Sequence, residues 1–219
     1  MIKMYGFWRS AASFRVRMAL NLKGLAYAEE MVNLDADEQH TSGYRTINPQ
    51  SDVPSVYIDG GPPLTQSIAI LEYLEDIHPE PALLPTDARG RARVRALSLL
   101  WAADHHPLIV PRVRRYLTEE LKVSDATRST WLRHWFREGL VLGEAALKGD
   151  LMTRRYCHGD TLTHADLCLM SQAMAARHSG VDFSDLPVLN RIVSSCLEID
   201  AISQALPLKQ RGAPPKSTL

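Results

Sequence analysis

The residues that could perform chemistry gather near the N-terminus, in residues 8–20, whose sequence is WRSAASFRVRMAL. An apolar run at residues 2–7 precedes them and predicts a strand, and Phe14, Met18 and Leu22 fall on one face of a predicted helix. A strand, a hydroxyl-bearing loop and a helix start together suit an anion. The first N–H groups of a helix have no partner, and the helix dipole there favours negative charge.

Ser10 would place a hydroxyl donor at this anion site, and Arg9, Arg15 and Arg17 would add positive charge around it. The local pattern alone favours a simpler interpretation, in which Ser10 or Ser13 is only the N-cap of the helix. Both interpretations stay open on these residues.

Val53-Pro54 begins another predicted strand. A cis bond here would leave the N–H and C=O of Val53 free for a peptide-like ligand. Base rates favour an ordinary trans proline at a sheet edge.

Asp104 falls on a predicted apolar helix stripe that also carries Val94, Leu97 and Trp101. A carboxylate on such a face is either paired or functional. The nearby Arg89, Arg91, Arg93 and Arg95 are interpreted as a solvated face, because no aromatic residues interleave with them as a nucleic-acid groove requires.

The chain has two parts with different sequence patterns, and together they would position these residues. Residues 1–84 alternate strands and helices, with strands predicted at residues 2–7, 27–32, 55–58 and 64–65 and a second helix at residues 66–77. Pro79, Pro81 and Pro85 mark a linker, and residues 90–219 are predicted to be all-helical. In that half, Thr163 and Asp166 have the spacing of a capping box that begins a helix.

Composition excludes several classes of function. The chain has 219 residues, and its 25 Lys and Arg balance its 25 Asp and Glu, which argues against a nucleic-acid or membrane-surface binder. Its three cysteines, Cys157, Cys168 and Cys196, form no metal-binding pattern, so no metal site is predicted and a reducing, cytoplasmic setting is expected. No membrane-spanning run and no signal peptide are visible.

Taken together, these landmarks resemble the glutathione transferase superfamily over nearly the whole chain. The segment WRSAASFRVRMALNLKG is similar to the zeta-class signature, usually SSC-x-WRVRIAL-x-LKG. Zeta enzymes include maleylacetoacetate and maleylpyruvate isomerases. The other matches in order and spacing are Asn48-Pro49, Val53-Pro54, Gln66-Ser67 and the box from Gly159 to Asp166.

The resemblance implies an α/β thioredoxin-like N-terminal domain that holds glutathione, an all-α C-terminal domain that closes the acceptor site, and a homodimer. It reverses both local interpretations, so that Ser10 becomes the expected thiol-activating residue and Val53-Pro54 an expected cis bond. The implied domains are residues 1–84 and 90–219.

The resemblance also assigns the glutathione ligands. Gln66 and Ser67 would bind the γ-glutamyl carboxylate, and the Val53 backbone would pair with the cysteinyl unit. Gln39 would serve the glycyl carboxylate, and Asp104 would reach the γ-glutamyl amine bound to the neighbouring subunit.

Two departures from the signature reduce the number of reactions that the chain could catalyse. The family's second serine and its cysteine are Ala11 and Ala12 here, which disfavours a dehalogenase that uses that cysteine. The thiol must then come from glutathione itself, with Ser10 the only matching hydroxyl.

Three arginines, Arg9, Arg112 and Arg177, align with positions that bind an acidic substrate in maleylpyruvate isomerase-like members. Ile109 and Val110 stand where those members carry polar residues, which weighs against maleylpyruvate.

The function implied is glutathione-dependent cis–trans isomerisation of a maleyl dicarboxylate, maleylacetoacetate to fumarylacetoacetate, in aromatic amino-acid or aromatic-compound degradation. The alternatives are a maleylpyruvate isomerase, a broad zeta-class transferase for small acidic or haloacid electrophiles, and a non-catalytic binding module. His105 and His106 are interpreted as core or rim residues.

Overall fold

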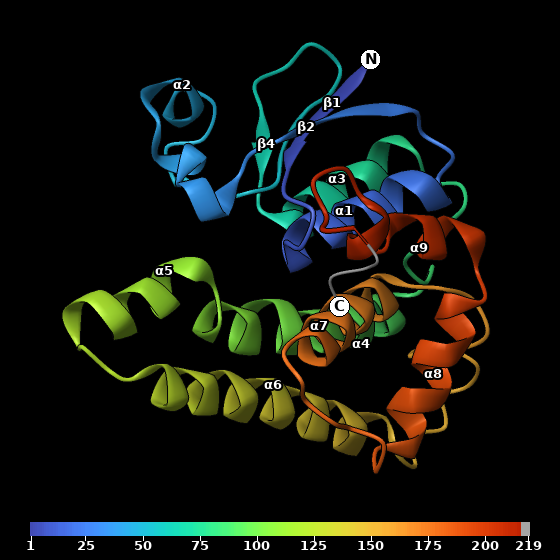
Figure 1. Ribbon diagram of the computed structural model, residues 1–219. Helices are drawn as coiled ribbons and strands as arrows, with labels where there is room; N and C mark the ends of the chain where they lie inside the picture. The colour runs from blue at the N-terminus through green and yellow to red at the C-terminus, as the bar shows by residue number, and fades with distance from the viewer. Residues whose placement is uncertain (216–219) are drawn as a thin grey trace. The chain divides into compact units, whose positions relative to one another are not determined.

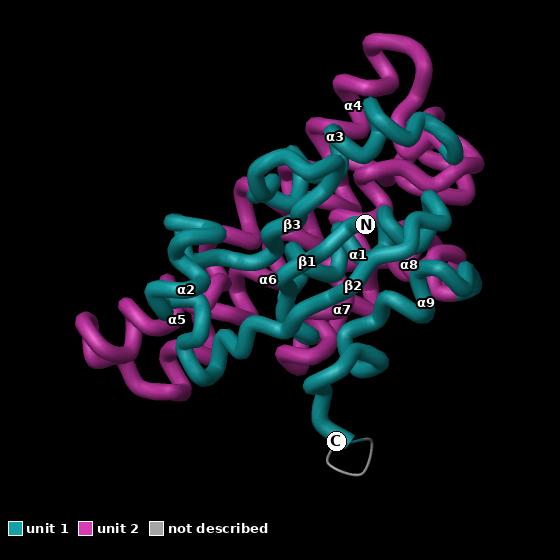
Figure 2. The backbone as a smooth tube through the Cα atoms, turned by 90° about the horizontal axis from the view of Figure 1, so that it is seen from above, with its two compact units in different colours: residues 1–81, 198–219 teal, residues 82–197 magenta. Residues whose placement is uncertain are grey.

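The computed structural model describes residues 1–215 and divides into two compact units (Figure 2). One unit contains Met1–Pro81 together with the residues from Glu198 onward, and the other is Ala82–Leu197. The sequence assigned residues 90–219 to one helical domain. Those from 198 group with the first unit instead, and residues 216–219 lie outside the described part.

The first unit is built on a four-stranded sheet of order β2-β1-β3-β4 (Figure 1). Its strands are β1 Ile2–Gly6, β2 Tyr27–Met31, β3 Ser55–Tyr57 and β4 Leu64–Thr65. Strands β1 and β2 are parallel and are joined through helix α1, Ala11–Leu22, whereas β3 is antiparallel to both β1 and β4. Helix α3, Ser67–Ile77, follows β4. The predicted strands and helices are confirmed within a few residues.

The polar connection at residues 33–45, between β2 and β3, is made of short ordered turns. It contains the 3-10 turns η1, Leu34–Ala36, and η2, Glu38–His40, and the short helix α2, Ser42–Arg45. The side chain of Thr41 accepts a hydrogen bond from the Tyr44 N–H at 3.3 Å and so caps α2. A side chain that bonds the local backbone can start a turn in a segment without an apolar period.

Helix α1 lies at the centre of the first unit and is buried around most of its circumference. It packs on α3 and on the short helix α9, Asp200–Ala205, where the amide of Asn21 donates to the carbonyl of Ala201 at 2.9 Å. These contacts explain why the residues from Glu198 join the first unit. The 3-10 turn η6, Pro207–Lys209, follows α9.

The second unit is helical, as predicted. Its elements are α4 Ala88–Leu99, the π-helical η3 Leu100–His105, η4 His106–Leu108, α5 Pro111–Arg115, the π-helical η5 Tyr116–Glu120, α6 Asp125–Leu147, α7 His164–His178 and α8 Pro187–Leu197. The helical path changes type near Pro107 and ends before Pro111, which begins α5. Proline lacks the N–H that an uninterrupted helix would need there.

The interpretation of the α4 arginines as a solvated face is wrong for Arg93. Its guanidinium forms an ion pair with Asp150 at 3.0 Å and donates to the carbonyl of Cys157 at 2.7 Å and to Thr153 Oγ1 at 2.9 Å. Arg93 therefore ties α4 to the loop after α6. Arg89, by contrast, is exposed as expected.

The capping box at the start of α7 is confirmed. Asp166 is fully buried, and its carboxylate accepts the N–H groups of Cys157 and Thr163 and the Thr163 hydroxyl, each at 2.8 Å. Burial raises the pKa of this carboxyl, while the same hydrogen bonds oppose the rise. One side chain thus holds both the helix and the preceding loop.

Replacing Asp166 by Ala should lower the free energy of unfolding by about 2–4 kcal/mol, because it removes a cap and leaves buried donors without an acceptor. Urea denaturation measures the change. The matched control is Asp160→Ala, since Asp160 lies in the same loop but is exposed, and its ion pair with Arg154 is exposed as well. We expect the control to change stability by less than about 0.5 kcal/mol, and equal losses would contradict the assignment.

Candidate active site

Ser10 caps helix α1 and keeps its hydroxyl proton available. Its Oγ accepts the N–H of Ser13 at 3.1 Å, and its side chain is partly exposed. Because that bond uses a lone pair of the oxygen, the O–H can still donate to another group. The N-cap interpretation is therefore confirmed. The role of Ser10 as a donor to an anion stays a prediction, with which this geometry is compatible because the O–H remains available.

The expected cluster of positive charge around Ser10 is only partly right. Arg9 forms an ion pair with Asp35 and lies over the rings of Phe7 and Trp8. Arg17 is fully buried and binds the carboxylate of Glu29 at 2.7 Å. Carboxylates therefore balance two of the three charges, which sequence spacing could not reveal.

Arg17 nevertheless shapes the loop before Ser10. Its Nη2 donates to the Phe7 carbonyl at 2.8 Å and its Nη1 to the Trp8 carbonyl at 3.3 Å. The buried side chain of Arg17 therefore fixes the main chain that leads into helix α1.

The Val53–Pro54 peptide bond is cis, as expected. Among the described residues, the N–H and carbonyl of Val53 have no hydrogen-bond partner, although its side chain is buried with Phe7, Trp8, Val32 and Tyr44. The preceding Asp52 carbonyl accepts the Tyr44 hydroxyl at 2.7 Å and the Asn48 amide at 2.8 Å. A rigid loop thus presents one residue with unpaired backbone groups, which suits an extended peptide.

Gln66 and Ser67 begin helix α3 in an unusual conformation. Gln66 has φ 67°, a region that residues other than glycine seldom occupy and that often marks a functional position. Its amide is exposed and donates to Gln50 Oε1 at 2.9 Å. Ser67 is buried, and its Oγ accepts a hydrogen bond from Arg15 Nη1 at 3.0 Å.

Gln39 lies in η2 and is almost fully buried. Its Nε2 donates to Asp37 Oδ1 at 3.2 Å, so the donor that a glycyl carboxylate would use faces another carboxylate. The role expected for Gln39 stays a prediction.

Asp104 does not lie on the buried stripe, which corrects the sequence interpretation. Trp101 is fully buried, whereas Asp104 is exposed. The π-helical turn from Leu100 to His105 inserts an extra residue into the helix, so the residues after Trp101 rotate off the predicted face. His105 is buried with its Nδ1 2.8 Å from the Leu100 carbonyl, consistent with a core histidine.

The two arginines of the second unit that were predicted to bind substrate are both exposed. Arg112 lies in α5, and Arg177 lies in the last turn of α7, 4.9 Å above the ring centroid of Phe183. Ile109 is buried, and Val110 precedes α5.

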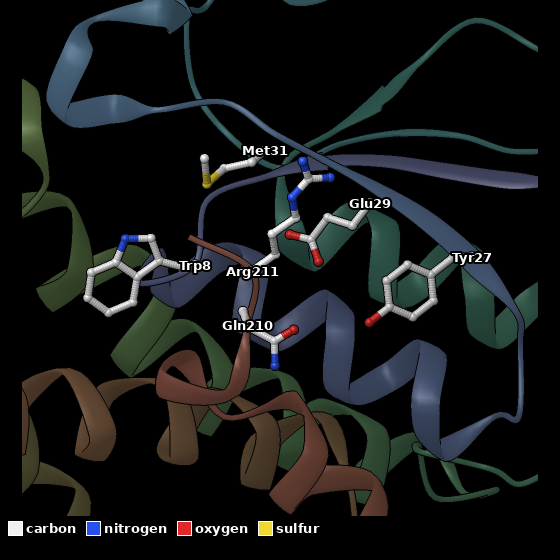
Figure 3. Close-up of a pocket in the computed structure, with 6 residues that line it drawn as sticks. All are labelled: Trp8, Tyr27, Glu29, Met31, Gln210 and Arg211. Atoms are coloured by element: carbon white, nitrogen blue, oxygen red, sulfur yellow. The ribbon is translucent and has the colours of Figure 1, made fainter. Parts of the chain in front are cut away.

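A cavity of about 250 Å³ lies at the edge strand β2 (Figure 3). Its lining residues are Trp8, Tyr27, Glu29, Met31, Gln210 and Arg211, and none of them is a predicted site residue. Figure 3 shows the side chain of Arg211 beside that of Glu29, whose carboxylate Arg17 also binds. The acidic group of this cavity therefore belongs to a structural ion pair.

The chain's own thiols are poor nucleophile candidates. All three cysteines are buried and free of disulfides, and burial raises the pKa of Cys157 and Cys196. Among residues 1–215, no cluster of His, Cys, Asp or Glu could hold a metal ion. Nor is any described helix both long enough and apolar enough to cross a membrane.

Comparison with known proteins identifies the family. Residues 9–77 match the model of the glutathione S-transferase N-terminal domain. The maleylpyruvate isomerase of Ralstonia sp is 40% identical over 209 residues, which cover 95% of this chain and 98% of the relative. The chain belongs to the glutathione S-transferase family.

Solved structures of the family place the chain within the zeta class. The maleylacetoacetate isomerase from Methylobacterium extorquens AM1, with bound malonate and glutathione, has a TM-score of 0.96 and 47% identity, covering 97% of this chain and all of that one. The maleylacetoacetate isomerase from Anaeromyxobacter dehalogenans 2CP-1, with bound dicarboxyethyl glutathione and citrate, has a TM-score of 0.86 and 39% identity, covering 99% and 96%. These relatives confirm the predicted combination of a thioredoxin-like domain and a helical domain.

Proposed function

We propose that this chain is a glutathione-dependent cis–trans isomerase that converts maleylacetoacetate to fumarylacetoacetate in the degradation of aromatic amino acids or aromatic compounds. The observation that carries the proposal is Ser10, a helix-capping hydroxyl whose proton remains available at the first turn of α1. Zeta-class relatives that share nearly the full length of the chain support the reaction type.

The residues present fit glutathione. The unpaired backbone of Val53 would pair with the cysteinyl unit, and Gln66 and Ser67 at the start of α3 would bind the γ-glutamyl carboxylate. Gln39 would serve the glycyl carboxylate if its Nε2 turned away from Asp37, to which it now donates. Asp104, exposed on η3, would reach the γ-glutamyl amine in the other subunit of a homodimer, and the enzyme would work in the cytoplasm.

Ser10 and the helix start can supply the free energy that thiol ionisation needs. A glutathione thiol has a pKa near that of free cysteine, roughly 8.5, and lowering it by about two units requires roughly 2.7 kcal/mol. A hydrogen bond to a charged group supplies ~1.5–3 kcal/mol, and a helix N-terminus adds ~0.3–1 kcal/mol.

When bound, glutathione would supply a thiolate that adds to the maleyl double bond and leaves after rotation about the resulting single bond. Ser10 would hold the sulfur anion before addition and receive it again after expulsion, so no glutathione is consumed. The Anaeromyxobacter relative was solved with dicarboxyethyl glutathione, a derivative of glutathione that carries two carboxyl groups on an ethyl unit, which supports addition to a dicarboxylic acid as the first step.

Arg9, Arg112 and Arg177 would bind the substrate carboxylates, because a guanidinium meets a carboxylate with two parallel hydrogen bonds. The same charges would stabilise the negative charge that develops on the substrate in the transition state. Arg9 now pairs with Asp35, so a substrate carboxylate would have to replace that exposed partner.

Maleylpyruvate is the second candidate substrate, because the Ralstonia relative is named a maleylpyruvate isomerase. Buried Ile109 and the adjacent Val110 beside Arg112 favour the less polar maleylacetoacetate instead. The two acids can be compared directly.

The purified enzyme with catalytic glutathione should convert maleylacetoacetate to its fumaryl isomer faster, as kcat/KM, than it converts maleylpyruvate. Proton NMR of the vinyl region follows both reactions, and a thiol assay should find no net loss of glutathione. Stoichiometric loss of the thiol would indicate a transferase instead of an isomerase. If calorimetry detected no glutathione binding, the alternative of a non-catalytic binding module would be favoured.

The Ser10→Ala variant should raise the pKa of the bound glutathione thiol by about one to two units, which is the loss of one hydrogen bond to a charged sulfur. Thiolate absorbance against pH measures it. Ser10→Thr is the matched control, because threonine keeps both the hydroxyl and the N-cap acceptor. An unchanged titration in the alanine variant removes Ser10 from this role.

Replacing Arg112 or Arg177 by Met should raise the KM for the maleyl acid roughly tenfold or more, because each loses a charge-assisted hydrogen bond. The KM for glutathione should change little. Arg89→Met is the control, since Arg89 is an exposed arginine of the same unit. Equal effects in all three variants would mean that general electrostatics, rather than binding by these two residues, attracts the substrate.

A further inference from the structure

Ser67 is held by a buried arginine from another helix. Arg15 lies in α1 and is 1% exposed, and its Nη1 donates to Ser67 Oγ at 3.0 Å. Ser67 is itself buried and is the first residue of α3, against which α1 packs. The guanidinium of Arg15 thus contacts the hydroxyl of the residue that begins α3.

This contact sets the direction in which Ser67 can donate. A guanidinium has donors only, so Ser67 Oγ must accept from Arg15, and its own proton must go elsewhere. Among the described residues no acceptor for that proton is found. A hydroxyl that accepts from a cation is polarised and becomes a stronger donor.

Arg17 shows that burial in α1 does not by itself produce this arrangement. It lies two residues further along the same helix and is also fully buried, yet its guanidinium meets the carboxylate of Glu29 and two main-chain carbonyls. Arg17 therefore closes a structural ion pair, whereas Arg15 contacts a hydroxyl at a helix N-terminus.

We propose that Arg15 is a positioning residue that orients the Ser67 hydroxyl as a donor to the γ-glutamyl carboxylate of glutathione. The inference rests on the proposed function. It adds that recognition of this carboxylate depends on a charge behind Ser67 that does not itself need to touch the ligand. The N–H groups at the start of α3 and the buried guanidinium act on the carboxylate in the same sense.

The test compares two ligands by calorimetry. One is glutathione, and the other is γ-aminobutyryl-cysteinylglycine, which is glutathione without the γ-glutamyl α-carboxylate. The dissociation constant of the analogue divided by that of glutathione measures how strongly the protein recognises that carboxylate. A variant that only loosens the fold weakens both ligands and leaves the ratio unchanged.

In Arg15→Met the ratio should fall about tenfold or more, because a charge-assisted donor is lost. Ser67→Ala should lower it by a similar factor, and the double variant should fall no further, because both residues act through one hydroxyl. Arg17→Met is the matched control and should keep the wild-type ratio even if stability falls. Additive losses, or an unchanged ratio in Arg15→Met, would overturn the proposal.

If Arg15→Met does not unfold cooperatively, Arg15→Lys decides, because it keeps the buried charge but lacks the planar fork. Its ratio should fall at least about threefold, and an unchanged ratio overturns the proposal. Failure of the wild-type protein to bind glutathione would overturn the proposed function itself. Wild-type binding with an unchanged ratio in the variants would overturn only the role of Arg15.

Discussion

Two buried guanidinium groups fix helix α1, and each supports a different part of the candidate glutathione site. Arg17 holds the carbonyls of Phe7 and Trp8, so it fixes the main chain that leads to Ser10. Arg15 reaches Ser67 and joins α1 to the start of α3. The planar fork of arginine can bridge several groups in one geometry, and water competes little at a buried site.

The two candidate hydroxyls are in the same chemical state. Ser10 accepts from the Ser13 N–H and Ser67 from a guanidinium, so each oxygen is held in place while its proton is free to donate. Each also stands at a helix N-terminus, where unpaired N–H groups face the same direction. The fold thereby offers two separate places for negative charge within one unit, which suits a ligand that carries a thiolate and a carboxylate.

Local patterns were enough to predict the strands, the helix at residues 66–77 and the capping box of α7, because each depends on residues close in sequence. The cis bond at Val53–Pro54 needed the family resemblance, since base rates alone favoured trans. Asp104 was misplaced because composition does not signal a π-helical turn. Arg93 was misread, and the contact of Arg15 with Ser67 was missed, because their partners lie more than fifty positions away and only tertiary packing brings them together.

The first unit is discontinuous, and this affects how the protein is made. Helix α1 leaves the ribosome early, yet α9, which packs on it, and Ala213, which packs against the cluster of Phe7, Trp8 and Val53, are synthesised only after the second unit. A nascent chain that ends near Pro81 therefore exposes apolar surface that only the segment after the second unit can cover. The ligand-binding unit is therefore completed only after the second unit has been synthesised, although nearly all of its expected glutathione-binding residues precede that unit.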